Sequence, residues 1–143
     1  MTKINNIKAR QVFDSRGMPT VETEIHLDDG SLASAIVPSG ASTGTYEAFE
    51  LRDTENKKYL GKSVLKAVNK INGEIFNELK GFDVGDQKKI DDFLIKLDGT
   101  KQKKRLGANT ILSISLAACK VSAVSKGIPL YKNIGAKRSL PFP

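Results

Sequence analysis

Small and hydroxyl-bearing residues are concentrated in residues 37–44, which read Val-Pro-Ser-Gly-Ala-Ser-Thr-Gly. The glycines let the backbone approach a ligand closely, while Ser39, Ser42 and Thr43 can offer oxygen to a hard cation or donate hydrogen bonds to a phosphate. This composition suits a lid over an anionic, metal-bound ligand. It is equally typical of an ordinary polar turn, so the residue types alone leave both interpretations open.

The chain has one histidine and one cysteine, His26 and Cys119. His26 shares a strand register with Glu22 and Glu24, which makes it a formal candidate for a metal ligand or a general base. It falls on the polar face without convergent partners, so we expect a solvated side chain. Cys119 lies in an apolar helical segment with no histidine to activate it, which predicts a packed side chain rather than a nucleophile.

Basic residues outnumber acidic ones by 23 to 16, and they cluster at residues 57–58, 88–89 and 101–105. These clusters contain no aromatic residues for base stacking and match no nucleic-acid motif, so we expect solvated surfaces that suit an anionic substrate or an acidic partner domain. No apolar run approaches the roughly 20 residues of a membrane span, and the first residues lack the apolar core of a secretory signal. We therefore expect a soluble, cytoplasmic protein.

The first part of the chain predicts an antiparallel meander. A strand over residues 4–13 ends at a turn-forming cluster, and residues 20–27 alternate cleanly between apolar and polar positions. The hairpin signal Asp28-Asp29-Gly30 then leads into a third strand over residues 31–37, which delivers the chain into the small-residue loop.

The second part predicts helices. Residues 63–79 carry an apolar face that Leu65 and Phe76 widen, and a second helix begins after Asp86 as its cap. Residues 109–126 are apolar around most of their circumference, which predicts a helix buried on nearly all sides, and residues 130–134 add one more turn. The predicted fold class is α+β: a three-stranded antiparallel β-meander followed by about three or four helices.

Three motifs together carry a family resemblance. They are residues 14–22 (Asp-Ser-Arg-Gly-Met-Pro-Thr-Val-Glu), residues 37–44 and residues 106–112 (Leu-Gly-Ala-Asn-Thr-Ile-Leu). In this order they resemble the N-terminal domain of the enolases, the phosphopyruvate hydratases. The resemblance implies a cap domain over residues 1–138 and the start of a connection into an α/β barrel over residues 139–143. A barrel needs on the order of 200 further residues, so we expect it to be missing here.

The resemblance also implies an activity. Enolases reversibly dehydrate 2-phosphoglycerate to phosphoenolpyruvate in glycolysis, with Mg²⁺ as cofactor. The family's lysine base, glutamate acid and first set of metal-binding carboxylates lie on the barrel, so we expect no catalytic residue in this chain and no activity from it alone. The implied partners are the chain's own barrel and, at full length, a second copy in a homodimer or higher homo-oligomer. A cytoplasmic protein is implied, with a cell-surface or secreted pool possible.

Site residues follow from the resemblance by position. The lid that closes over substrate corresponds to Ser39, Gly40, Ala41, Ser42, Thr43 and Gly44. Ser42 matches the family's ligand to the second Mg²⁺, through its carbonyl and hydroxyl oxygens, whereas Arg16 and Glu22 match residues that pair with the partner's barrel across the dimer interface. The chain departs from the family at Met18, Tyr46 and Ser113, where Asn, His and Gly are frequent. We expect Met18 to affect the turn and Tyr46 to affect closure of the lid.

Two alternatives come from other functional classes. Another dehydratase or racemase of the wider superfamily would share the architecture, but it would generally lack the loop at residues 37–44. A non-catalytic fragment could instead bind plasminogen-type proteins through its lysines, and a lysine analogue would then block the binding. A cap domain without its barrel should also expose apolar surface and self-associate.

Overall fold

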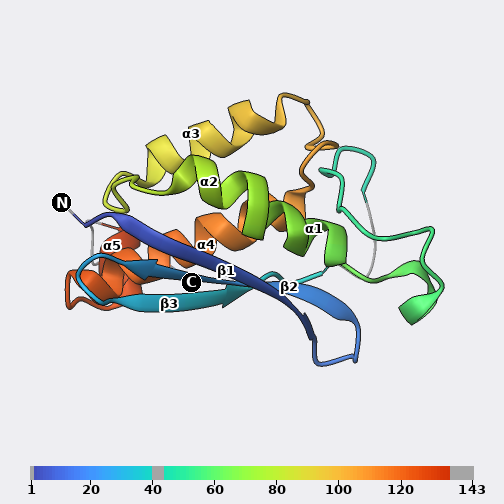
Figure 1. The fold of residues 1–143 in the computed structure, drawn as a ribbon, viewed down its shortest axis with the longest axis horizontal. Helices are drawn as coiled ribbons and strands as arrows, with labels where there is room; N and C mark the ends of the chain where they lie inside the picture. The colour runs from blue at the N-terminus through green and yellow to red at the C-terminus, as the bar shows by residue number, and fades with distance from the viewer. Residues whose placement is uncertain (1, 40–43, 136–143) are drawn as a thin grey trace, which may run out of the picture.

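The computed structural model describes residues 2–39 and 44–135, and it confirms the predicted α+β fold. The three-stranded antiparallel sheet has the order β1-β2-β3, and helices pack against one of its faces (Figure 1). β1 is Ile4–Phe13, β2 is Pro19–Leu27 and β3 is Leu32–Ile36. The predicted alternation in β2 is confirmed, because Val21 and Ile25 are fully buried while the glutamates between them are half-buried on the other face.

The turn between β1 and β2 is closed by main-chain and carboxylate contacts. Asp14 N donates to Met18 O at 2.8 Å, and Met18 N donates to Asp14 Oδ1 at 2.9 Å. Gly17 takes the left-handed conformation at φ 73°, which costs little only for glycine. Since Met18 contributes its backbone to these bonds, the turn forms with methionine at this position.

The first long helical segment is continuous but changes its winding in the middle. α1 (Leu65–Lys70) passes into the π-helical η2 (Ile71–Ile75) and then into α2 (Phe76–Leu79). Within η2, Asn72 accepts a hydrogen bond from Ala9 N at 2.7 Å and donates one to Ala9 O at 3.0 Å. These bonds satisfy the main-chain N–H and C=O of Ala9 on the edge strand β1. The expected contribution of Leu65 to the apolar face is wrong: its side chain is 43% exposed.

The short 3₁₀ helix η1 (Lys58–Gly61), which the sequence did not predict, precedes α1, and α3 (Gln87–Asp98) follows α2. Asp86 caps α3 as predicted, since its carboxylate accepts from Lys89 N, and Gly99 ends the helix in the left-handed conformation. α3 packs on α4 (Ala108–Ser125), which lies between α3 and the sheet (Figure 1).

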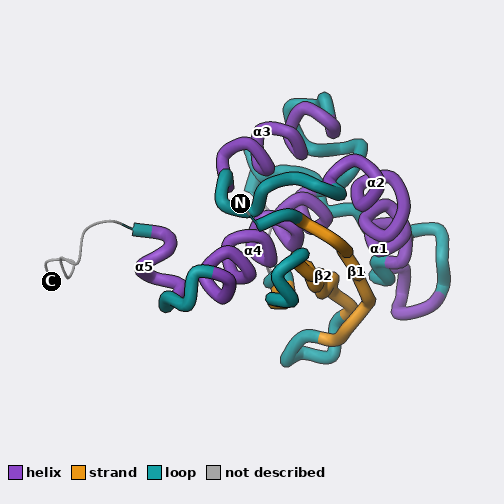
Figure 2. The backbone as a smooth tube through the Cα atoms, turned by 60° about the vertical axis from the view of Figure 1, so that its left-hand side comes forward, coloured by secondary structure: helices purple, strands orange, loops and turns teal. Residues whose placement is uncertain are grey.

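α4 is the central helix, and it is followed by α5 (Leu130–Ile134), which extends away from the sheet (Figure 2). The length and composition of α4 would allow this helix to cross a bilayer, but half of α4 is buried inside the domain, as in the core helix of a globular protein. The prediction that α4 is buried on nearly all sides is wrong, because Leu112, Leu116 and Val124 of this helix are exposed. Leu32 and Ile36 of β3 are also exposed, so apolar surface is uncovered as expected; self-association stays a prediction.

Candidate functional site: the stem of the loop at residues 39–44

The predicted lid is described only at its ends, Ser39 and Gly44. Gly40, Ala41, Ser42 and Thr43 lie outside the described residues, and with them the predicted magnesium ligand. What the structure gives is the stem that holds this loop. We call residues 37–39 the incoming arm and residues 44–52 the outgoing arm.

The incoming arm begins as a fixed extension of β3. Val37 N donates to Val21 O at 3.0 Å, and the Thr20 hydroxyl donates to Val37 O at 2.6 Å. Val37 is buried, and these two bonds satisfy both of its main-chain polar groups within the domain. The chain therefore leaves the sheet in a defined direction.

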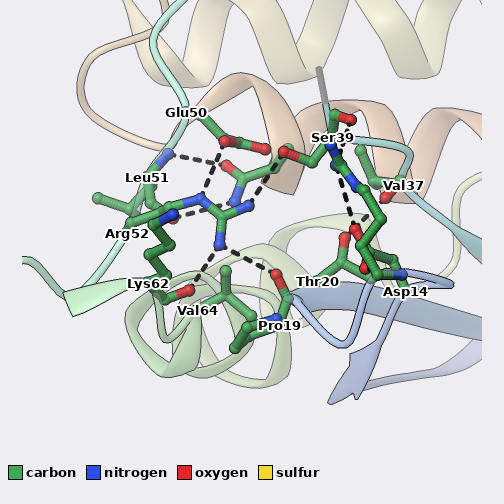
Figure 3. A network of polar contacts seen from close by, with 12 residues as sticks. Asp14, Pro19, Thr20, Val37, Ser39, Glu50, Leu51, Arg52, Lys62 and Val64 are labelled. Carbon is green, nitrogen blue, oxygen red and sulfur yellow. Dashed lines mark hydrogen bonds and ion pairs between the residues drawn. The ribbon is translucent and has the colours of Figure 1, made fainter. Parts of the chain in front are cut away.

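Two arginines donate to Ser39, the last described residue of the incoming arm, and Figure 3 labels one of them, Arg52, beside it. Arg16 donates from Nη2 to Ser39 O at 3.0 Å, and Arg52 donates from Nη2 to Ser39 Oγ at 3.2 Å. Arg16 is itself oriented by Asp14, whose carboxylate accepts from Arg16 N at 2.8 Å and pairs with the guanidinium at 3.3 Å. The hydrogen bond from Met18 N, supported by those from Arg16, lowers the pKa of Asp14 below its ordinary value, so this carboxylate is charged at neutral pH.

Arg52 uses three of its nitrogens to join four different segments. Besides Ser39, Nε donates to Glu50 Oε2 at 2.9 Å, and Nη1 donates to both Pro19 O at 2.9 Å and Lys62 O at 2.5 Å. Its side chain is only 14% exposed. The planar guanidinium fork suits this task, since its donors point in several fixed directions at once.

The outgoing arm is fastened to the beginning of α4. Leu51 N donates to Asn109 Oδ1 and Asn109 Nδ2 donates to Leu51 O, each at 2.9 Å. Next to this pair, Phe49 N donates to Gln102 O and Ala108 N donates to Phe49 O, each at 2.7 Å. Thus both arms of the loop are attached to the body of the domain, and Arg52 connects one arm to the other.

The other two predicted site residues, Arg16 and Glu22, do not pair with each other. Arg16 faces the loop stem, whereas Glu22 forms an ion pair with Arg10 at 3.2 Å on the open face of the sheet. Arg10 also pairs with Glu24 at 3.4 Å, and Glu24 accepts from His26 at 2.8 Å. That hydrogen bond from His26 is the main cause of the lowered pKa of Glu24. His26 is 37% exposed, so it belongs to a surface ion-pair network.

The described residues hold no group of three or more His, Cys, Asp or Glu side chains that could bind a metal ion. A serine carbonyl and hydroxyl are hard oxygen donors that suit Mg²⁺, but they supply only part of its six-ligand shell. The donor chemistry therefore fits a loop that contributes one ligand residue to a site completed by other groups. On the outgoing arm, Tyr46 is almost fully exposed and lines an open depression together with Lys101 and Lys104.

Sequence reasoning missed Arg10, Arg52 and Asn109 as members of these networks. Their partners lie up to 58 residues away along the chain, so no local pattern joins them. One signal was available: Arg52 is a charged residue in an irregular connection, and Asn109 is an amide at the start of an otherwise apolar helix. Such positions favour a side chain that satisfies exposed backbone groups.

Comparison with known proteins agrees with the fold and with the motifs at the site. Residues 4–134 match the family described as "Enolase, N-terminal domain". The chain is also similar to the enolase of Pelagibacter ubique (strain HTCC1062), with 60% identity over 145 residues that cover 100% of this chain and 34% of the relative. The chain thus spans about a third of the length of that relative. Together with the three-stranded sheet and the helices that follow it, the match over residues 4–134 shows that this chain belongs to the enolase N-terminal domain family.

Proposed function

We propose that this chain is the N-terminal domain of an enzyme that reversibly dehydrates 2-phosphoglycerate to phosphoenolpyruvate with Mg²⁺. The observation that carries the proposal is the family match across residues 4–134, which includes the small-residue loop at residues 37–44. The loop stem supports a role in binding, because both arms are fixed while the loop between them consists of small residues. The wider dehydratase and racemase superfamily explains this loop less well.

The proposed contribution of the domain is the lid, Ser39 to Gly44. Ser42 would hold the second Mg²⁺ through its carbonyl and hydroxyl oxygens, as hard donors to a hard ion. The ion supplies positive charge beside the substrate carboxylate when the neighbouring carbon loses its proton. Closure of the lid would exclude water, and the small residues would let the main chain approach the substrate. The lysine base and the glutamate acid would come from the barrel, so the 143 residues alone would not catalyse.

The proposed assembly is a homodimer or higher homo-oligomer of the full-length protein in the cytoplasm. Arg16 and Glu22 are the proposed contacts to the partner's barrel. The Glu22 side chain is 17% exposed and pairs with Arg10, which is 43% exposed, so this ion pair reaches the surface and could meet a partner there. Arg16 faces the loop stem instead, so its contact with a partner would have to use the exposed part of its side chain.

Phosphoenolpyruvate formation tests the proposal. Full-length protein and the 143-residue chain are each incubated with 2-phosphoglycerate and Mg²⁺, and the product is followed by absorbance and verified by mass. We expect turnover by the full-length protein and none by the short chain. Lack of product from folded full-length protein contradicts the proposed reaction, and turnover by the short chain contradicts the assignment of the chemistry to the barrel.

A further inference from the structure

We propose that Arg52 is a positioning residue that ties the two arms of the lid loop together. This inference rests on the proposed function of the loop and adds a residue that acts through Ser39 rather than on the substrate. Arg52 lies on the outgoing arm, and its Nη2 donates to the hydroxyl of Ser39 on the incoming arm at 3.2 Å (Figure 3). The bond therefore bridges the base of the loop.

The guanidinium of Arg52 is held on its other sides. Nη1 donates to the carbonyl oxygens of Pro19, at the start of β2, and of Lys62, while Nε pairs with Glu50. Two rigid carbonyls and one carboxylate thus fix the plane of the fork before it reaches Ser39. With 14% of the side chain exposed, these bonds are partly shielded from water and have more effect than exposed ones.

The hydroxyl contact of Ser39 comes from Arg52, while Arg16 donates to its carbonyl. The two contacts differ in kind: the Arg16 bond survives any substitution at position 39 that keeps the backbone, whereas the Arg52 bond needs the serine side chain. Up to Val37 the incoming arm is fixed to β2 by the bond from Val37 N to Val21 O and by the bond from the Thr20 hydroxyl to Val37 O. Beyond that point, Ser39 is tied to the outgoing arm through Arg52.

Lysine cannot replace this fork. An ammonium group carries the same charge but acts as a compact point donor on a flexible stem, so it cannot reach Ser39, Pro19, Lys62 and Glu50 together in one plane. Substitution Arg52→Lys should therefore keep the local charge and lose the bridge. The energy of one charge-assisted hydrogen bond corresponds to roughly a tenfold effect in an equilibrium between productive and unproductive loop positions.

The test uses the full-length protein and three variants at the loop stem: Arg52→Lys, Ser39→Ala and the double variant. Steady-state kinetics with 2-phosphoglycerate at saturating Mg²⁺ give KM and kcat well below the melting temperature. We expect each single variant to lower kcat/KM by about tenfold, mainly through KM, and the double variant to be no worse than either. Arg105→Lys is the matched control, because Arg105 also donates to a main-chain carbonyl, Leu97 O, and pairs with a carboxylate, Glu74, and neither partner belongs to an arm of the loop.

Unchanged kcat/KM in the single variants would overturn the proposal, and so would independent, additive losses, which would mean that Ser39 acts on the ligand without Arg52. If Arg52→Lys does not fold, Ser39→Ala decides alone through hydrogen exchange on the outgoing arm, which Ser39 contacts only through Arg52 among the bonds described above. A second readout needs no turnover: amide hydrogen exchange at residues 37–39 and 44–49 should rise in both single variants and stay unchanged in Arg105→Lys. An inactive wild type would therefore count against the proposed reaction, whereas unaltered exchange would count against the bridge.

Discussion

The side-chain amide of Asn109 pairs with the main chain of Leu51 through two hydrogen bonds, each 2.9 Å long. The amide presents one acceptor and one donor, as a neighbouring β-strand would, so it satisfies both polar groups of a residue that has no strand partner. Because Asn109 stands in the first turn of α4, this pair fixes the outgoing arm of the loop to the central helix of the domain.

Asn109→Ala should therefore destabilise the domain by about 1–3 kcal/mol, since it leaves the partly buried N–H and C=O of Leu51 without partners. Urea unfolding of the 143-residue chain, followed by circular dichroism, measures this change. Asn5→Ala, at an exposed position on β1, serves as the control and should change the free energy of unfolding by less than about 0.5 kcal/mol. If both substitutions changed the free energy of unfolding equally, the two hydrogen bonds between Asn109 and Leu51 would make no specific contribution to stability.

Gly107→Ala should disturb the same junction by steric overlap. Gly107 has φ 91°, and an added Cβ would lie 2.4 Å from Leu51 Cβ and 2.7 Å from Asn109 Oδ1. Both the strained backbone and the overlap cost free energy, together more than about 2 kcal/mol. Gly73→Ala is the control, because its added Cβ meets nothing within 4 Å and its φ is ordinary. A wild-type melting temperature for Gly107→Ala would contradict this packing.

Ser113 makes a buried contact between α4 and β2. Its hydroxyl lies 2.8 Å from Thr23 Oγ and donates to Thr110 O at 2.9 Å. Ser113→Ala should cost about 1–2 kcal/mol by leaving the Thr23 hydroxyl unpaired. Adding Thr23→Val should recover part of that loss, since both polar partners are then removed. Additive losses in the double variant, measured by urea unfolding, would mean that the two hydroxyls do not interact.

Asp98 should make stability depend on pH in acid. Burial raises the pKa of this carboxyl, but the hydrogen bonds from Thr100 and Leu106 outweigh that effect, so the pKa lies below its ordinary 3.8. The folded state therefore binds the proton less readily than the unfolded state. The stabilisation is complete above the unfolded pKa and is lost as pH falls through the folded one.

The substitution Asp98→Asn tests this assignment. At pH 7 the variant should be less stable by about 1–3 kcal/mol, because Thr100 N and Leu106 N donate to different carboxylate oxygens and an amide keeps only one of these acceptors. Between pH 4 and 2 its free energy of unfolding should fall less steeply than that of the wild type. Parallel pH profiles for the two proteins would show that another carboxylate is responsible.

The fold was predictable because its patterns are local. Alternation places Val21 and Ile25 in the core, and Asp86 caps α3 through a contact three residues away. The stem of the loop was not predictable in the same way. Arg52 meets Ser39 and Pro19 only after the sheet and the connection are folded, and the bonds of Asn109 span 58 residues.

The error at α4 has a different cause. Its composition is apolar around the helix, yet the sheet and the neighbouring helices leave one side open, so Leu112, Leu116 and Val124 stay exposed in the described part of the chain. Composition alone does not distinguish a side chain buried within this domain from one that another domain would cover.

The most direct measurement is the Mg²⁺ dependence of phosphoenolpyruvate formation by full-length wild type and its Ser42→Ala variant, at fixed 2-phosphoglycerate. The variant keeps the main-chain carbonyl but loses the hydroxyl that we propose as a metal ligand, so we expect turnover by the wild type and a requirement for roughly tenfold more Mg²⁺ in the variant. Identical Mg²⁺ curves would contradict the role of the loop in metal binding, and a folded wild type that forms no phosphoenolpyruvate would contradict the proposed reaction itself.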